Sequence, residues 1–390
     1  MDMKTRTPTP TATATAPLTA AAKAIAPATA LAGAGLDLAA LGRWLAPHLG
    51  TAVQGLRAER MNGGQSNPSW RLRATAPGGE AHSWVLRAKP GPAASLLPSA
   101  HAIEREFRVL SALQGSAVPV PAVLALCEDE SVLGAAFYVM DWVDGRVLRE
   151  AHLPTLDNAA RTACHADALQ VLAALHRLDW RAAGLQGFGR EGAFFSRLVS
   201  RWTKQYRGSV TEPVPAMERL ADWLLAHIPA GADDAGRTCL THGDFRLENL
   251  MFHPTQPRVV AVLDWELATL GHPLSDLAYH CMAWHLPSGV LRGMADQPLS
   301  ALGIPGERET IARYCELTGW LLDAVLADWA FYMACNLFRL AAILLGIEAR
   351  VRQGTAAHPD ALAITRMARP VAELGWTIAS GAVPALTEPR

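Results

Sequence analysis

The chain has 390 residues, half of them hydrophobic, and a formal net charge of −1. This apolar content is enough for a folded core and excludes disorder along the whole length, and the length itself favours two or three compact units. The near-balance of charge argues against a dedicated nucleic-acid or acidic-membrane binder, so we expect neither partner.

The cysteines indicate the cellular compartment, and the few lysines limit which residues a lysine-dependent mechanism could use. The six cysteines are widely spread and no pair has Cys-x-x-Cys spacing, which predicts free thiols and a cytoplasmic protein. The N-terminus lacks the continuous apolar segment of a signal peptide. Only four lysines occur, so a mechanism that needs a lysine in the folded part has two candidates, Lys89 and Lys204.

The first part of the chain predicts a tail followed by a small, strand-rich lobe. Residues 1–35 are rich in Ala, Thr and Pro and predict a disordered tail. The following segment, 36–143, predicts a lobe in which strands dominate. Its expected elements are helices over 36–49 and 100–113 and strands over 70–74, 83–88, 123–126 and 137–143.

The remainder, 144–390, predicts a larger helical lobe. Expected helices cover 158–178, 194–206, 217–227, 273–285, 307–318, 322–353 and 359–380, and short strands cover 239–241 and 259–263. The most apolar stretch, 329–347, contains Asn336 and Arg339 and therefore predicts a buried helix rather than a membrane span. The fold class is α+β and bilobal, an architecture that commonly binds ligands between its lobes.

One segment carries a specific chemical signal. Asp244 lies in a loop after a short strand, Asn249 follows five residues later, and Asp264 ends another apolar strand. Phosphoryl transfer needs one carboxylate to accept the proton of the acceptor hydroxyl, and a carboxylate and an amide oxygen to hold Mg²⁺ on the nucleotide phosphates. Arg246 could place a cation near the migrating phosphoryl group. The alternative is a polar turn in which Asp264 caps a helix.

The segment from His242 to Asn249, with Asp264, resembles the catalytic and metal-binding loops of the aminoglycoside phosphotransferase family, which has the protein-kinase-like fold. It is closest to the kinase-like domain that precedes acyl-CoA dehydrogenase modules in some fusion proteins. Further similarity lies at 63–67, 96–101, 137–140, 261–279 and 338–343, within a region of about 36–355.

The resemblance implies roles for individual residues. Asp244 would be the catalytic base, and Asn249 and Asp264 would bind Mg²⁺. The nucleotide would be ATP, with GTP as an alternative. The loop formed by Gly64, Gln65, Ser66 and Asn67 would cover the phosphates with backbone amides; no GxxxxGK[ST] motif is present, which excludes a Walker-type site.

The strand over 83–88 departs from the family pattern. The family's phosphate-binding lysine position is occupied by Arg87, and Lys89 lies two residues further on the same face. Either could contact the phosphates, and Arg87 raises a second hypothesis, a pseudokinase that binds nucleotide or acyl-CoA without catalysis. The ion-pair partner is expected to be Glu106, with Glu104 as the alternative.

The family pattern also assigns the segment that links the lobes. Met140 and the backbone of Asp141 and Val143 would contact the adenine. His176 is expected to be structural, and Asp276 to cap a helix or brace the catalytic loop.

The acceptor is expected to be a small molecule bound in the helical lobe. Candidate contacts are Trp202, Tyr206, Trp284 and Arg339, although aromatic residues at such positions are also typical of a packed core. Aromatic and arginine side chains suit an apolar acceptor with an anionic group, and the resemblance points to a hydroxy acid or hydroxyacyl-CoA. An aminoglycoside, a polycation that needs several carboxylates, is the alternative.

Overall fold

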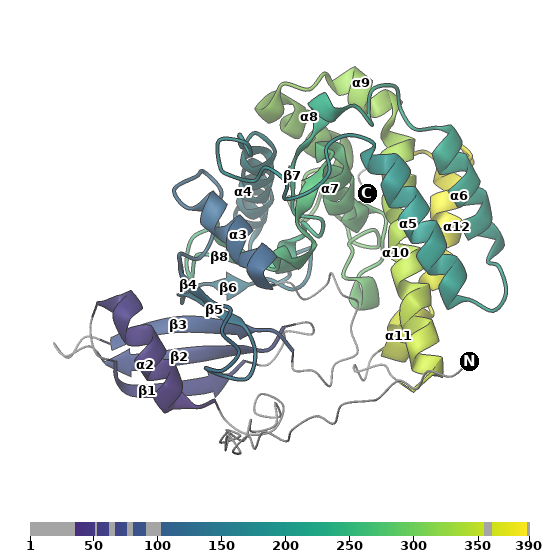
Figure 1. Cartoon of the computed structure of the whole chain (residues 1–390). Coiled ribbons are helices and arrows are strands. Elements are labelled where there is room, and N and C mark those ends of the chain that lie inside the picture. The colour runs from purple at the N-terminus through teal and green to yellow at the C-terminus, as the bar shows by residue number, and fades with distance from the viewer. Residues whose placement is uncertain are drawn as a thin grey trace, which may run out of the picture.

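The computed structural model describes residues 36–50, 53–61, 67–75, 81–90, 103–354 and 361–387. The predicted tail over 1–35 and the phosphate-loop candidates Gly64, Gln65 and Ser66 lie outside these residues. Figure 1 shows a small lobe built on a sheet beside a larger helical lobe, as the bilobal prediction requires.

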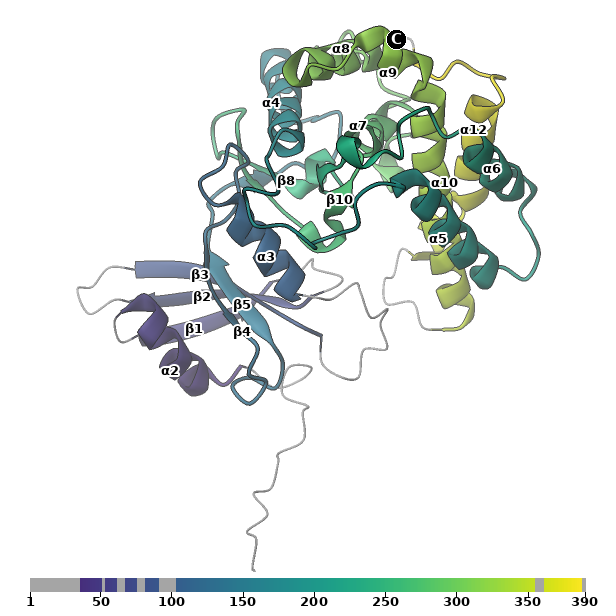
Figure 2. The same cartoon turned by 45° about the horizontal axis from the view of Figure 1, so that its top comes forward.

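The small lobe is a five-stranded antiparallel sheet with one helix on each face. The strand order is β1-β2-β3-β5-β4, and α2 and α3 pack on opposite faces (Figures 1 and 2). The bounds are β1 Gln54–Arg60, β2 Ser69–Thr75, β3 Ala81–Ala88, β4 Val123–Cys127, β5 Phe137–Asp141, α2 Leu38–Leu49 and α3 Ile103–Leu113.

Successive side chains along β3 and β5 point to opposite faces of the sheet, and this decides which of them face the helical lobe. Leu86 and Phe137 belong to the core under α2, whereas Tyr138 belongs to the core that includes α3. Arg87 is paired directly with Tyr138 in the register of β3 and β5. Because side chains alternate between the two faces of a strand, Arg87 lies on the α3 side of the sheet.

Helices and short strands form the large lobe. The helices are α4 Asn158–His176, α5 Phe194–Ser209, α6 Pro215–Ala226, α7 Pro273–Cys281, α8 Glu307–Thr318, α9 Leu322–Ala327, α10 Trp329–Arg352, α11 Ala361–Thr365 and α12 Ala368–Ala379. The strands are β6 Arg146–Val147, β7 Cys239–Thr241, β8 Leu250–Phe252, β9 Val259–Val262 and β10 Thr269–Gly271. Short 3₁₀ turns are η1 Ala235–Arg237, η2 Leu247–Asn249, η3 Trp265–Leu267, η4 Met282–Trp284 and η5 Gly289–Leu291.

Two helices that the sequence predicts as continuous are broken. The chain leaves helical geometry at Asp328, between α9 and α10, because the buried Trp329 is anchored there by a 2.9 Å hydrogen bond from its Nε1 to Glu307. In the segment expected over 359–380, α11 ends before α12 because Pro370 has no N–H to continue the earlier helix.

Helix α10 is the central helix of the large lobe. It packs against α5, α6, α7 and α12, and Figure 1 shows it beside α5. Among the described residues it is the one helix that is long and apolar enough to cross a membrane, and 78% of its apolar window is buried inside the protein. Its apolar character is therefore accounted for by the core, as the sequence predicts.

Candidate active site

The catalytic loop follows β7 and is held from behind by α7. The Asp276 carboxylate accepts hydrogen bonds from the backbone N–H groups of His242, at 2.6 Å, and Gly243, at 2.9 Å. Gly243 has φ of 82°, a left-handed conformation that favours glycine. The predicted bracing role of Asp276 is confirmed, whereas the helix cap is supplied by His272, whose ring accepts from the Leu274 amide.

Asp276 is itself held in place by residues in the core of the large lobe. His176 contacts Asp276 through Nε2 at 3.4 Å and the Tyr314 hydroxyl through Nδ1 at 2.6 Å. Burial alone would raise the pKa of Asp276, but hydrogen bonds from His176 and from the His242 amide lower it below its ordinary value. The carboxylate is therefore charged and rigidly placed, and His176 has the structural position expected of it.

Asp244 projects from this loop with its orientation fixed by Asn249. The Asn249 side-chain amide donates both to the Asp244 backbone carbonyl, at 2.8 Å, and to Asp244 Oδ2, at 2.9 Å. The Arg246 Nε lies 3.4 Å from Asp244 Oδ1. Tyr279 also contacts Asp244, and its hydroxyl pKa is raised by burial and by the Asp244 carboxylate, so the phenol remains protonated beside it.

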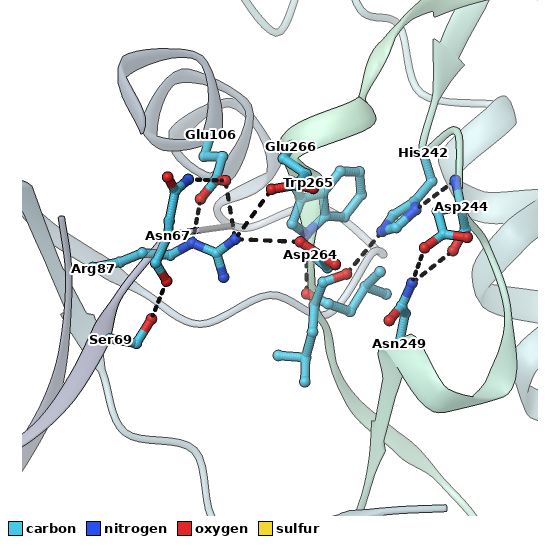
Figure 3. A network of polar contacts seen from close by, with 12 residues as sticks. Asn67, Ser69, Arg87, Glu106, His242, Asp244, Asn249, Asp264, Trp265 and Glu266 are labelled. Carbon is cyan, nitrogen blue, oxygen red and sulfur yellow. Dashed lines mark hydrogen bonds and ion pairs between the residues drawn. The ribbon is translucent and has the colours of Figure 1, made fainter. Parts of the chain in front are cut away.

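Strand pairing brings Asn249 and Asp264 together. Strands β8 and β9 are antiparallel with Leu250 opposite Val262, and the Leu263 amide donates to the Asn249 carbonyl at 2.8 Å. The His242 ring also donates from Nε2 to the Leu263 carbonyl at 2.8 Å, which ties the two loops to each other (Figure 3). Asp264 is the next residue and has φ of 65°, a strained conformation that is frequent at functional sites.

The donor set at this point fits Mg²⁺. An amide oxygen from Asn249 and the partly exposed carboxylate of Asp264 are the hard oxygen ligands that Mg²⁺ takes from proteins in small numbers, completing its shell with water and phosphate. No cluster of three or more His, Cys, Asp or Glu side chains that could hold a metal occurs among the described residues, so a metal held entirely by such side chains is not indicated there.

Arg87 joins the small lobe to this site (Figure 3). Its Nε lies 2.8 Å from Glu106 Oε2, and its Nη2 lies 3.2 Å from Asp264 and 3.8 Å from Glu266. Glu106 is only 2% exposed and also accepts from Tyr138 and Asn67. The predicted pairing of Arg87 with Glu106 is confirmed, and the Glu104 alternative is occupied by Lys89 instead.

Arg87 and the carboxylates around it shift one another's pKa values. Burial alone would lower the pKa of Arg87, but the surrounding carboxylates raise it above its ordinary value. Burial raises the pKa of Glu106, and Arg87 opposes that shift. The guanidinium is thus fixed by several contacts in a place that faces the Asp264 carboxylate.

The predicted adenine contacts lie at the end of β5. Met140 and Asp141 are its last residues, and Val143 follows the strand. The Val143 amide makes no hydrogen bond with any described residue, which leaves it available to a ligand. Asn67 is buried, and its side chain donates to Glu106 rather than pointing outward.

A cavity of about 450 Å³ opens directly beside Asp244. Trp284 and Arg339, two of the four predicted acceptor contacts, line it. Trp202 lies outside the lining with its ring 5.9 Å from the Arg339 guanidinium. Tyr206 is fully buried elsewhere and donates its hydroxyl to Val214 at 3.5 Å, so the structure does not bring it to the cavity.

Several cavity residues were missed in the sequence. Arg149 and Arg292 line the cavity together with Arg246. Burial and the nearby guanidinium groups of Arg246 and Arg149 lower the pKa of Arg292. Arg339 is only 6% exposed, donates to the Gly243 carbonyl at 2.5 Å, and has no carboxylate partner among the described residues. No local motif marks Arg149 and Arg292, because they join the predicted Arg246 and Arg339 only through tertiary folding.

Comparisons with known proteins identify the family and the fold. A model of the phosphotransferase enzyme family (APH) matches residues 57–313. The mouse acyl-CoA dehydrogenase family member 10 is 44% identical over 344 residues, which cover 87% of this chain but 31% of that protein. The chain therefore spans about a third of that relative's length.

Solved structures show the same fold. A Ralstonia eutropha protein assigned as an aminoglycoside phosphotransferase is 47% identical, has a TM-score of 0.80, and is matched over 89% of this chain and 99% of its own. A thermostable mutant of the aminoglycoside phosphotransferase APH(4)-Ia, crystallised with AMP-PNP and hygromycin B, is 15% identical with a TM-score of 0.55, over 88% of this chain and 99% of that one. The second likeness concerns the fold alone.

Proposed function

Because this chain belongs to the phosphotransferase enzyme family and has its protein-kinase-like fold, we propose that it is a small-molecule kinase that transfers the γ-phosphoryl group of ATP to a substrate hydroxyl. The observation that carries the proposal is the position of Asp244. It lies in the wall of a cavity, oriented by Asn249 and joined to Asp264 through paired strands.

Asp244 is proposed as the catalytic base. Its carboxylate accepts the proton of the acceptor hydroxyl as the oxygen bonds to the γ-phosphorus and the bond to the β-phosphate oxygen breaks. Arg246 places positive charge beside it, and both residues line the cavity. Asn249 keeps the carboxylate directed toward the acceptor.

Asn249 and Asp264 are proposed to hold Mg²⁺. When bound, the ion neutralises charge on the nucleotide phosphates. Arg87 is proposed to contact those phosphates, since it already faces Asp264 and is fixed by Glu106. Lys89 is engaged with Glu104 and is not needed for this role.

The nucleotide is proposed to bind between the lobe over 36–143 and the lobe over 144–390. The Asp141 carbonyl and the free Val143 amide would pair with the adenine, Met140 would pack on it, and the loop over 63–67 would cover the phosphates. Competition between ATP and GTP in the same assay decides the base preference. All six cysteines are free, which supports a cytoplasmic reaction.

The acceptor is proposed to be a hydroxy acid or a hydroxyacyl-CoA thioester. Four arginines line the cavity, and the carboxylate of Glu248 is already paired with two of them, Arg246 and Arg292. An anionic, largely apolar molecule fits this lining better than an aminoglycoside polycation. The similarity to acyl-CoA dehydrogenase family members supports the same acceptor class.

A screen of acceptors tests the proposal. The protein is incubated with Mg·ATP and 4-hydroxyacyl-CoAs, free hydroxy acids and aminoglycosides, and phosphorylated products are measured by mass spectrometry. We expect product from the first two classes. Absence of any phosphorylated product, with nucleotide binding intact, would contradict the kinase proposal.

The catalytic base gives a sharper prediction. Asp244→Asn keeps the size of the side chain but removes proton acceptance, so kcat should fall by about 10²- to 10⁴-fold while ATP binding is retained. Asp264→Ala should instead weaken Mg²⁺-dependent binding of ATP. Equal kcat for Asp244→Asn and the unmodified chain would exclude Asp244 as the base.

A pseudokinase is the second candidate, favoured by the presence of Arg87 at the expected lysine position. It predicts nucleotide or acyl-CoA binding without turnover. Phosphoryl transfer by the unmodified chain that is lost in Asp244→Asn would reject it, because a pseudokinase has no turnover to lose.

A further inference from the structure

The lining of the cavity beside Asp244 includes two histidines among apolar residues. His165 comes from α4 and His280 from α7, and each is 4% exposed. Trp284 lies near both, with ring centroids 6.0 Å from His165 and 5.8 Å from His280. The surrounding apolar lining includes Met282, Leu286, Leu340, Ile343 and Leu344.

The hydrogen bonds of His165 are incomplete. Its Nε2 lies 3.1 Å from the Ala151 carbonyl, which can only accept, so Nε2 carries the proton and Nδ1 carries a lone pair. That Nδ1 is buried and has no hydrogen-bond partner within the described part of the chain. Buried acceptors are usually satisfied, so an unpaired one in a cavity wall points to a ligand donor.

His280 is also without a hydrogen bond from its ring to the described residues. Its ring centroid lies 5.8 Å from that of Phe245, the residue that follows the catalytic Asp244, and the neighbouring Tyr279 contacts Asp244 itself. The two histidines therefore belong to the same cavity as Asp244, on the acceptor side of the site.

Both imidazoles are neutral at physiological pH. Burial and the nearby His280 lower the pKa of His165 to about 3, and burial lowers that of His280 to about 4. A neutral imidazole offers one N–H and one lone pair, and it binds an uncharged polar group better than an anion. The arginines, which suit the acceptor's charged group, thus have a different function from this pair.

We propose that His165 and His280 form a specificity subsite for a second, uncharged hydroxyl on the acceptor, separate from the hydroxyl that is phosphorylated. The hydroxyl donates to His165 Nδ1 and accepts from the His280 ring. This inference rests on the proposed function for the identity of the acceptor pocket, and it adds that the acceptor has a polar substituent within its apolar body.

A series of hydroxy fatty acids tests the subsite. The probes are a 4-hydroxy fatty acid and its analogues with a second hydroxyl moved one carbon at a time along the chain, bound to the full chain with AMP-PNP and measured by calorimetry. One analogue should bind about tenfold more tightly than the parent, as expected of neutral hydrogen bonds in a dry site. That gain should disappear in His165→Phe and in His280→Phe.

Met282→Leu is the matched control, because it changes a neighbouring lining residue without removing a hydrogen bond. It should keep the preference for the dihydroxy probe. The ¹⁵N signal of His165 Nδ1 in the unmodified chain should also shift when that probe binds, which needs no variant. Equal affinity across the series, or a preference that survives both histidine substitutions, overturns the proposal.

Binding and turnover separate the two hypotheses. A dihydroxy preference without phosphoryl transfer would support the subsite and contradict the kinase proposal. Phosphoryl transfer with no preference and no ¹⁵N shift would support the kinase proposal and contradict the subsite.

Discussion

Arg87 shows how one side chain can connect two lobes. Its guanidinium reaches Glu106 on α3 and Asp264 after β9 at the same time, which a single ammonium group could do only in part. An arginine at this position is therefore compatible with an ordered nucleotide site. The kinase proposal expects turnover with this arginine in place, and the pseudokinase expects none.

The contribution of Arg87 to stability can be measured directly. Arg87→Ala leaves Glu106 buried without its counter-charge, and loss of one partner of a buried pair typically costs about 3 kcal/mol of unfolding free energy. Urea denaturation measures this loss. Adding Glu106→Gln to Arg87→Ala should recover part of it, because the second change removes the unpaired charge.

Lys89→Met is the control, one residue beyond the end of the strand that carries Arg87. Lys89 and Glu104 keep about a third of their side chains exposed, so removing this pair should cost no more than about 1 kcal/mol. Equal losses for Arg87→Ala and Lys89→Met would mean that the Arg87 cluster has no special role in stability.

At the scale of elements, the sequence predicts more of the catalytic loops than of the cavity. Asp244, Asn249 and Asp264 occur in one short region whose spacing carries their chemistry, and strand pairing then brings them together. Arg149 and His165 have no such local signal, because their function depends on tertiary contacts between distant segments.

Helix boundaries show the same limit. Periodicity predicts α8 over its observed bounds, but it misses the break at Asp328, since the deciding contact joins Trp329 to Glu307 in another helix. Tertiary interactions of this kind are not visible in a local pattern.

Gly243 is where the geometry of the catalytic loop is most restrictive. It has φ of 82°, and a Cβ at this position would lie 2.7 Å from the Leu267 carbonyl oxygen. Gly243→Ala should therefore displace the loop that carries Asp244, lowering kcat by at least about tenfold and the free energy of unfolding by more than about 1 kcal/mol.

Gly319→Ala separates backbone strain from this collision. Gly319 has φ of 79°, and a Cβ added there would meet nothing within 4 Å, so this position has the strain without the collision. The substitution should cost about 1 kcal/mol and leave kcat unchanged. Comparable kcat for the two variants would show that the loop tolerates the collision with Leu267.

Three histidines of the helical lobe, His165, His272 and His280, are buried as neutral groups. Burial lowers the pKa of His165 and His272 to about 3 and that of His280 to about 4, from an ordinary value of 6.5. At a pH between the folded values of about 3 to 4 and the ordinary value of 6.5, the unfolded chain binds protons that the folded chain does not. Their contribution to stability is therefore complete above pH of about 6.5 and is lost progressively as the pH falls through the folded pKa values.

Urea denaturation across pH should show this dependence. Between pH of about 7.5 and about 5.5 each histidine should remove about 1.4 kcal/mol, so the three together should lower the unfolding free energy by about 4 kcal/mol. His272→Asn keeps a residue that can cap α7 but cannot be protonated. It should reduce the pH slope by about one proton whatever its effect on stability at neutral pH, and an unchanged slope would mean that His272 is protonated in the folded protein.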